Sequence, residues 1–181
     1  LYSAELKADG TVGKPERFEK KINSKFNEST PVFTKDGKTM YFTRNNYLDG
    51  KRGKDDQKIT LLKLYKAEFL NGKWINITEL PFNSDQYSTA HPALSTDEKI
   101  LYFASDMPGT LGQSDLYSVR INSNGSFDKP ENLGATINTE GRETFSFISA
   151  DNELYFASDG RPGLGGLDVF VSTINNNGTF S

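Results

Sequence analysis

PVFTKDGKTMYFTRN (31–45), PALSTDEKILYFASD (92–106) and FISADNELYFASD (147–159) are three versions of one pattern. In each, a short apolar run meets a turn centred on an aspartate, and an adjacent pair of aromatic residues follows. Self-similarity within one chain is typical of repeat architectures, so the spacing of the copies decides the fold class.

Two further blocks recur in the same order. KLYKAEFLNGKW (63–74), DLYSVRINSNGSF (115–127) and DVFVSTINNNGTF (168–180) follow the three copies, and LYSAELKADGTV (1–12) is an additional version. INSKFNESTP (22–31), FNSDQYSTAHP (82–92) and INTEGRETFSF (137–147) lead into them. The second block returns after 52 and 53 positions (Tyr65, Tyr117, Phe170), but after 63 positions between Tyr2 and Tyr65, which indicates an insertion in the first full copy.

Each block is typical of β-strands. Runs rich in Val, Ile, Leu, Tyr and Phe are bounded by Gly, Asn, Asp and Ser, and the Asp-Gly and Asn-Gly pairs favour tight hairpin turns. The stretch 58–70 also fits helical spacing, but the aligned blocks are strand-like, so we expect a long strand there with a hairpin that carries the charged insertion. One unit contains four antiparallel strands in about 53 residues, which is the content of a propeller blade.

The fold class predicted is therefore all-β, a β-propeller of four-stranded antiparallel blades with about three and a half blades in this chain. The chain is expected to form one partial propeller domain over 1–181. This domain consists of the end of a preceding blade (1–26), a blade with the charged insertion near 45–60 (27–86), a further blade (87–142) and the start of the next (143–181). The residues expected to repeat for structural reasons are Asp36, Tyr41, Tyr65, Asp97, Tyr102, Tyr117, Asp151, Tyr155 and Phe170.

Composition excludes several kinds of chemistry. The 181 residues contain no Cys and a single His, which removes thiol nucleophiles, disulfide scaffolds and His-cluster metal sites. A net charge of −3 does not indicate the basic surface that nucleic-acid-binding proteins have. No apolar run approaches the length of a membrane span. We therefore expect no enzymatic activity, no cofactor, no nucleic-acid partner and no transmembrane segment in this chain.

Several of these motifs resemble a known family. Thr34-Lys35-Asp36-Gly37-Lys38, Ser105-Asp106, Ser158-Asp159-Gly160 and GRPGLGGLDVFVS (160–172) resemble the WD-like, TolB-type propeller repeat of Bacteroidetes cell-envelope proteins. The resemblance implies a ring of six or seven blades in a periplasmic, outer-membrane-associated lipoprotein of the OmpA family, in some cases part of gliding or type IX secretion machinery. It departs after Arg44, where the charged insertion replaces the Gly-rich loop.

The Gly-rich loops and the lone histidine are candidate sites with ordinary structural alternatives. Aspartates flank each Gly-rich loop and are weak candidates for a calcium site, although fixing a tight loop explains them better. His91 is interpreted as a surface or capping residue, because no G-x-S-x-G motif accompanies it. The candidate cation ligands are Asp106, Asp115, Asp159 and Asp168.

The insertion is the one long, charged, blade-specific loop, and such departures from a repeat are where binding function tends to lie. The candidate partner-binding residues are Asp49, Lys51, Arg52, Lys54, Arg142 and Arg161.

The function we expect is a protein-interaction scaffold in the periplasm whose partners are other envelope proteins, with peptidoglycan bound only through a domain outside this chain. The alternative is a glycan-binding or glycan-processing propeller, which aromatic residues clustered around the axis would favour.

Overall fold

The computed structural model describes residues 1–175 and 177–181, and within these ranges every regular element is a β-strand. With no helix in the described part of the chain, the structure has none long and apolar enough to cross a membrane. The all-β prediction is confirmed. The strands are β1 (Tyr2–Ser3), β2 (Glu16–Arg17), β3 (Glu28–Phe33), β4 (Thr39–Asn45), β5 (Tyr47–Leu48), β6 (Lys51–Arg52), β7 (Leu62–Leu70), β8 (Lys73–Glu79), β9 (Thr89–Leu94), β10 (Ile100–Ser105), β11 (Asp115–Arg120), β12 (Glu131–Asn132), β13 (Glu143–Ile148), β14 (Glu153–Ser158) and β15 (Asp168–Thr173).

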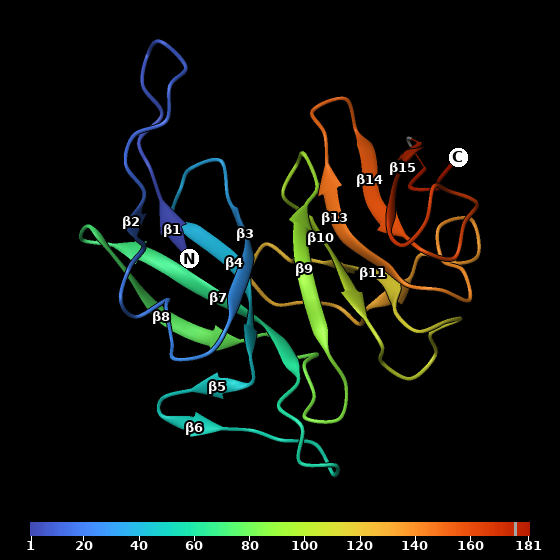
Figure 1. The fold of residues 1–181 in the computed structure, drawn as a ribbon, viewed down its shortest axis with the longest axis horizontal. Coiled ribbons are helices and arrows are strands. Elements are labelled where there is room, and N and C mark those ends of the chain that lie inside the picture. Colours follow the sequence, from blue (N-terminus) through green and yellow to red (C-terminus); the bar gives the residue numbers. More distant parts are fainter. Residues whose placement is uncertain (176) are drawn as a thin grey trace.

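The larger sheets are antiparallel and follow chain order, and we call them blades. Blade 1 has the order β3-β4-β7-β8, blade 2 the order β9-β10-β11-β12, and blade 3 the order β13-β14-β15. Their first strands, β3, β9 and β13, lie side by side at the centre, and the other strands fan outward from them (Figure 1). Each blade is thus a meander that begins at a shared centre and ends at the rim.

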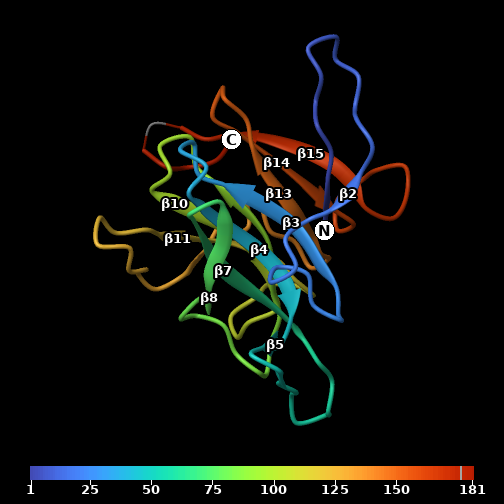
Figure 2. The same ribbon diagram turned by 90° about the vertical axis from the view of Figure 1, so that its left-hand side faces the viewer.

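Two parts of the chain match only a portion of a blade. In β1–β2, Tyr2 pairs with Arg17, in the same register as Tyr117 with Asn132 in β11–β12. The hairpin therefore corresponds to the third and fourth strands of a blade, and the loop between its strands projects away from the sheets (Figure 2). Blade 3 has three strands, followed by an isolated bridge between Ile174 and Phe180.

The aspartate-centred turns share one backbone hydrogen bond, in which the N–H of Gly37, Glu98 or Asn152 donates to the carbonyl three residues earlier, and in two of the turns the aspartate side chain adds further bonds. Asp36 Oδ1 accepts hydrogen bonds from the Thr34 hydroxyl at 2.7 Å and from the backbone N–H of Lys38 at 2.9 Å, and Asp97 makes the equivalent pair. These bonds, the side-chain hydroxyl first, hold the pKa of Asp36 below its ordinary value. The next residue has positive φ in all three blades: Gly37 (66°), Glu98 (60°) and Asn152 (62°).

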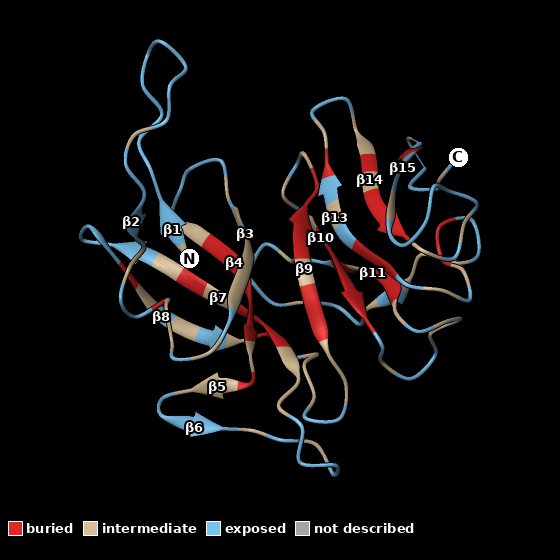
Figure 3. Cartoon of the chain, viewed as in Figure 1, coloured by how far each residue is buried: buried red, intermediate tan, exposed pale blue. Residues whose placement is uncertain are grey.

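The core consists of layers between stacked sheets. Tyr102 and Ala104 of blade 2 pack with Leu154 and Phe156 of blade 3 in one buried cluster, and β9 and β10 are buried along most of their length (Figure 3). A second cluster joins Tyr41 and other residues of blade 1 to the opposite face of blade 2. The middle strand of blade 2 is covered on both faces, which explains why its sequence ILYFAS is almost wholly apolar; the matching ELYFAS of blade 3 is covered on one face, and Tyr155 on the other is half-buried.

The ambiguous stretch 58–70 forms a strand, as the repeat predicted. β7 pairs with β4 over seven residues, from Asn45–Leu62 to Thr39–Glu68, so ladder hydrogen bonds prevail over the helical spacing of its apolar residues. The charged insertion forms the short hairpin β5–β6 with Asp49 and Gly50 at its turn, both at positive φ.

A repeated asparagine connects each blade to the chain that leaves it. Asn138 lies between β12 and β13 and returns to β11, where its Oδ1 accepts the N–H of Leu116 at 2.8 Å and its Nδ2 donates to the carbonyl of Leu116 at 3.0 Å. Asn83 makes the same two bonds to Leu64 of β7, at 3.1 and 2.7 Å. Asn23 bonds both backbone groups of Leu1. We call this contact the asparagine clamp.

The clamp leads to a prediction about stability. Substituting Asn138→Ala leaves the buried N–H of Leu116 without a partner, whereas the C=O of Leu116 still accepts the N–H of Leu133 at 3.0 Å. A buried N–H without a partner costs roughly 1–3 kcal/mol, so we expect the free energy of unfolding, measured by urea titration, to fall by about that amount.

Gln113→Ala is the matched control. Gln113 is exposed, no side-chain hydrogen bond of this residue is present, and its backbone N–H bonds a carbonyl that the substitution does not change. The free energy of unfolding of this control should lie within about 0.5 kcal/mol of that of the unmodified chain. Equal losses in the two variants would show that the clamp has no special role.

Candidate functional site

The three innermost strands share an irregularity at one repeat position. In β3, β9 and β13 the pairing register shifts, and the residue at the shift has positive φ although it is not glycine: Thr30 (44°), His91 (56°) and Phe145 (53°). Positive φ in bulky or β-branched residues is uncommon, and strained residues tend to cluster at functional sites. The centre of the blades is therefore the first place to look for a site.

These strands are also sheet edges, and the sequence protects them. An unpaired strand edge exposes backbone donors and acceptors that attract other strands. Pro31 and Pro92 follow the strained residues of β3 and β9, and proline removes an N–H at such an edge. Bulges together with prolines are the devices by which an edge avoids further strand pairing.

Residues of all three innermost strands line a groove of about 450 Å³, which we call the axial groove. Most of its lining is apolar. Two phenylalanines in the lining are exposed to solvent, Phe33 by 43% and Phe147 by 61%. Thr30 and Ser146 supply its hydroxyl groups. The remaining lining residues are Pro31, Val32, Pro92, Ala93, Leu94 and Ile148. Such a surface suits an apolar ring better than a strongly polar ligand.

His91 lies at the junction of the three blades, which corrects its interpretation as a surface or capping residue. Its backbone N–H donates to the Thr43 hydroxyl of blade 1 at 2.8 Å, and the Ser146 hydroxyl of blade 3 donates to its carbonyl at 2.9 Å. Its ring stacks on Phe145 at 4.0 Å between centroids, and Nδ1 is 2.5 Å from the Thr144 hydroxyl. Burial lowers the pKa of His91 to about 4.

The aspartates of the Gly-rich loops accept hydrogen bonds from the protein. Asp115 is fully buried and accepts from the N–H of Leu111 at 2.7 Å and from Asn132 at 2.7 Å. Asp106 accepts the N–H of Ser88 at 2.6 Å. Asp168 accepts the N–H of Gly165 at 3.2 Å, and no group of three or more potential metal-ligating side chains occurs among the described residues. Asp115 and Asp168 thus fix the Gly-rich loops that precede them, and Asp106 fixes the segment that enters β9.

The two arginines proposed as partner contacts bind within the chain. Arg142 forms an ion pair with Asp159, its Nε and one terminal nitrogen lying 2.8 and 2.6 Å from Oδ2. The Arg161 guanidinium lies over the rings of Phe156 and Phe170 and donates to the carbonyl of Ile137 at 2.9 Å. Neither side chain projects freely from the rim.

Arg44 fills in blade 1 the place that Arg161 fills in blade 3. Its guanidinium lies over Phe42 and Tyr65 and donates to the carbonyl of Ile22 at 2.6 Å. In blade 2 the corresponding carbonyl, that of Phe82, accepts the hydroxyl of Tyr87 at 2.8 Å. Three different residues therefore satisfy the carbonyl group that precedes each clamp asparagine.

Three insertion residues, Tyr47, Leu48 and Asp49, line one side of a second cavity, of about 510 Å³, which we call the hairpin pocket. Asp49 lines it, whereas Lys51 and Arg52 lie on the adjoining strand β6 and Lys54 is exposed just beyond. Sequence reasoning missed Lys20 and Lys21, which also line the pocket, because no repeat position marks them. The other lining residues are Asn23, Ser24, Arg44, Ile75, Asn76 and Ile77.

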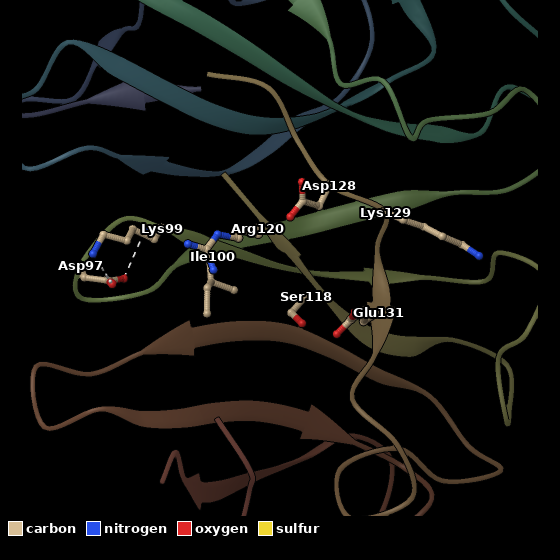
Figure 4. Close-up of a pocket in the computed structure, with 8 residues that line it drawn as sticks. All are labelled: Asp97, Lys99, Ile100, Ser118, Arg120, Asp128, Lys129 and Glu131. Atoms are coloured by element: carbon tan, nitrogen blue, oxygen red, sulfur yellow. Dashed lines mark hydrogen bonds and ion pairs between the residues drawn. The ribbon is translucent and has the colours of Figure 1, made fainter. Parts of the chain in front are cut away.

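A third cavity, of about 580 Å³, lies on the outer part of blade 2 (Figure 4). Its charged lining is balanced, with three acidic and three basic side chains, and Asp97 pairs with Lys99 at 3.5 Å. Figure 4 shows the Lys129 side chain directed away from the others. The lining is Asp97, Lys99, Ile100, Ser118, Arg120, Asp128, Lys129 and Glu131. The balanced charge indicates no particular ligand.

Among known proteins, the chain has detectable similarity only to solved structures. No protein-family description and no curated protein sequence matches the chain. A puromycin-hydrolyzing peptidase of Mycobacterium tuberculosis matches 80% of this chain and 20% of its own, with a TM-score of 0.52 and 18% identity. A puromycin hydrolase matches 99% of this chain and 26% of its own, with a TM-score of 0.54 and 17% identity. The chain thus spans about a fifth to a quarter of these proteins and shares their fold over that length.

These neighbours correct the prediction that the protein is not an enzyme. That prediction rested on the lack of catalytic motifs in the chain, yet these two neighbours are named as hydrolases. Because the chain matches only 20% and 26% of their lengths, the lack of catalytic motifs within it is no argument against an enzyme. Neither neighbour bears the name of a TolB-type envelope protein.

The position of His91 leads to a prediction about pH. Because its pKa in the folded state, about 4, lies below the ordinary value of 6.5, the unfolded chain binds more protons between these values. The contribution of the neutral ring to stability is present above pH 6.5 and is lost as the pH falls towards 4, by at most about 1.4 kcal/mol per pH unit.

The measurement is urea unfolding from pH 7.5 to 4.5, with His91→Asn as the comparison, because asparagine tolerates positive φ. The variant should lose less stability over this window than the unmodified chain. Parallel curves would mean that His91 titrates as it does when exposed.

Proposed function

We propose that the chain is part of a β-propeller ring whose axial groove binds a peptide segment through an aromatic side chain. Six or seven blades would close the ring, with further blades outside this chain. The exposed face of blade 3 supports this: Tyr155 and Val171 pair there as Tyr102 and Ser118 pair in blade 2, while Phe147, on the innermost strand, lines the groove. On blade 2 this face packs against blade 3, so on blade 3 it suits a further blade.

The observation that carries the groove function is the pair of phenylalanines that line the groove beside the strained positions of β3 and β13. Phe33 and Phe147 come from different blades and line one apolar groove. Aromatic rings pair favourably with other rings by about 0.5–1.5 kcal/mol beyond the area they bury. The bulges at Thr30, His91 and Phe145 fix the backbone beside these rings, so the groove needs little rearrangement on binding.

The structural neighbours support a peptide-like ligand. Both are named for puromycin hydrolysis, and one of them is named a peptidase. If the whole protein is a hydrolase, the groove would hold the aromatic part of a substrate whose bond is cleaved by residues elsewhere.

A glycan ligand is the weaker alternative for the same groove. The aromatic residues near the axis meet the expectation for a sugar-binding propeller, since sugar rings also stack on them. The groove lining, however, offers side-chain hydroxyls only from Thr30 and Ser146, and sugar hydroxyls buried without partners are costly.

A second candidate function is the interaction scaffold in the periplasm that the sequence resemblance implies, attached to the outer membrane by elements outside this chain. The β5–β6 hairpin favours it, because this element interrupts the repeat and gives blade 1 a surface that the other blades lack. Association with envelope or secretion complexes remains a proposal.

The groove proposal is tested by calorimetric titration of the chain with N-acetylphenylalanine amide, puromycin and a neutral oligosaccharide. We expect the two aromatic ligands to bind and Phe147→Ala to weaken their binding by about tenfold, since the variant loses a stacking partner worth roughly 1.4 kcal/mol.

Leu164→Ala is the control, because Leu164 is fully exposed in the Gly-rich loop of blade 3 and lies outside the groove lining. This variant should bind as the unmodified chain does. Unchanged affinity in Phe147→Ala, or tighter binding of the oligosaccharide, would contradict the proposal.

A further inference from the structure

The geometry of the hairpin pocket points to a recognition site for an acidic peptide segment of a partner protein. This inference is independent of the axial groove; it gives the second candidate function a specific surface and a partner chemistry.

The pocket is anchored to the core of blade 1. Arg44 occupies the position of Ser105 and Ser158 in the other blades, and its terminal nitrogen donates to the carbonyl of Tyr47 at 3.3 Å, where the hairpin begins. The N–H of Tyr47 donates to the hydroxyl of Tyr65 at 3.2 Å. The hairpin is therefore attached to buried groups at its root.

The pocket combines an apolar base with an excess of positive charge. Leu48, Ile75 and Ile77 contribute apolar surface, and Lys20 and Lys21 line the same cavity. Of the lining residues only Asp49 is acidic. A chain with a net charge of −3 thus has a local cationic site at this position.

Arg44 adds a buried cation to the lining. Its side chain is 3% exposed, and its Nε has no hydrogen-bond partner among the described residues, although the carboxylate of Glu28 lies 3.4 Å away. Burial lowers the pKa of the Arg44 guanidinium, and the nearby Glu28 opposes this shift. Because Glu28 neutralises Arg44, the net positive charge of the pocket comes from Lys20 and Lys21.

Further cations beside the pocket are held on aromatic rings. Phe26 and Tyr47 meet edge to face at 5.1 Å, and the Lys25 ammonium lies 5.5 Å from each ring centre. The guanidinium of Arg52, on β6, lies 5.3 Å from the centre of Phe26. Side chains already placed on ring faces lose less freedom when a ligand binds.

These features favour an acidic peptide over other anions. Exposed ion pairs contribute little affinity by themselves, so a tight partner must also cover the apolar base. A peptide that places a Leu or Val side chain on Leu48 and Ile77, with Asp or Glu beside it, meets both requirements. A nucleic acid would contact a single small cationic patch on an otherwise acidic protein.

The test uses fluorescence anisotropy with a labelled ten-residue peptide of Glu and Leu, and with the same peptide in which Gln replaces Glu. We expect the Glu peptide to bind more tightly, and its affinity to fall as NaCl rises from 50 to 300 mM. The double variant Lys20→Glu/Lys21→Glu should weaken binding by about tenfold or more at 50 mM NaCl.

The matched control is Lys99→Glu/Lys129→Glu, which makes the same charge change on the outer cavity of blade 2. It should retain most of the affinity, and Phe147→Ala in the axial groove should bind the peptide unchanged, which separates this site from the groove. Equal losses in the two double variants, equal binding of the Gln peptide, or tighter binding of single-stranded RNA than of the Glu peptide would overturn the inference.

Discussion

The pair of hydrogen bonds between Asn138 and the backbone of Leu116 is the contact on which the arrangement of the blades depends. The Asn138 side chain accepts the N–H of Leu116 and shares the C=O of Leu116 with the N–H of Leu133, so the chain that leaves blade 2 is bonded directly to the third strand of that blade. Asn83 and Asn23 repeat the contact at Leu64 and Leu1. Because the same amide fixes where the next blade begins, the clamp sets the stacking distance and brings β3, β9 and β13 together at the centre.

Both proposed sites follow from this arrangement. Stacked blades expose their first strands as edges, and the bulges and prolines that protect these edges leave the side chains of Phe33 and Phe147 in the axial groove. At the other end of blade 1, Arg44 replaces the serine of the repeat and bonds the root of β5–β6. One site thus arises from features that all blades share, and the other from the point at which blade 1 departs from them.

The sequence was sufficient for the strands and turns, because each depends on local chemistry that the repeat displays three times. The aspartate turns and the assignment of β7 as a strand are examples. It was insufficient where partners come from distant or non-equivalent positions. Arg44 and Arg161 bond equivalent carbonyl groups from positions that do not align in the repeat, and His91 bonds residues 48 and 53 positions away. Lys20 and Lys21 belong to no repeat block and become significant only beside the folded hairpin.

The central claim is that the clamp is part of the cooperative core, which makes the axial groove a preformed surface. Native-state hydrogen exchange of the Leu116 amide tests it directly, since the hydrogen-bond acceptor of this N–H is the side chain of Asn138. We expect the Leu116 amide to exchange only through global unfolding, with the same protection as the amides of Leu101 and Phe103 in β10. Exchange at the rate of the surrounding loops, while β10 stays protected, would contradict it.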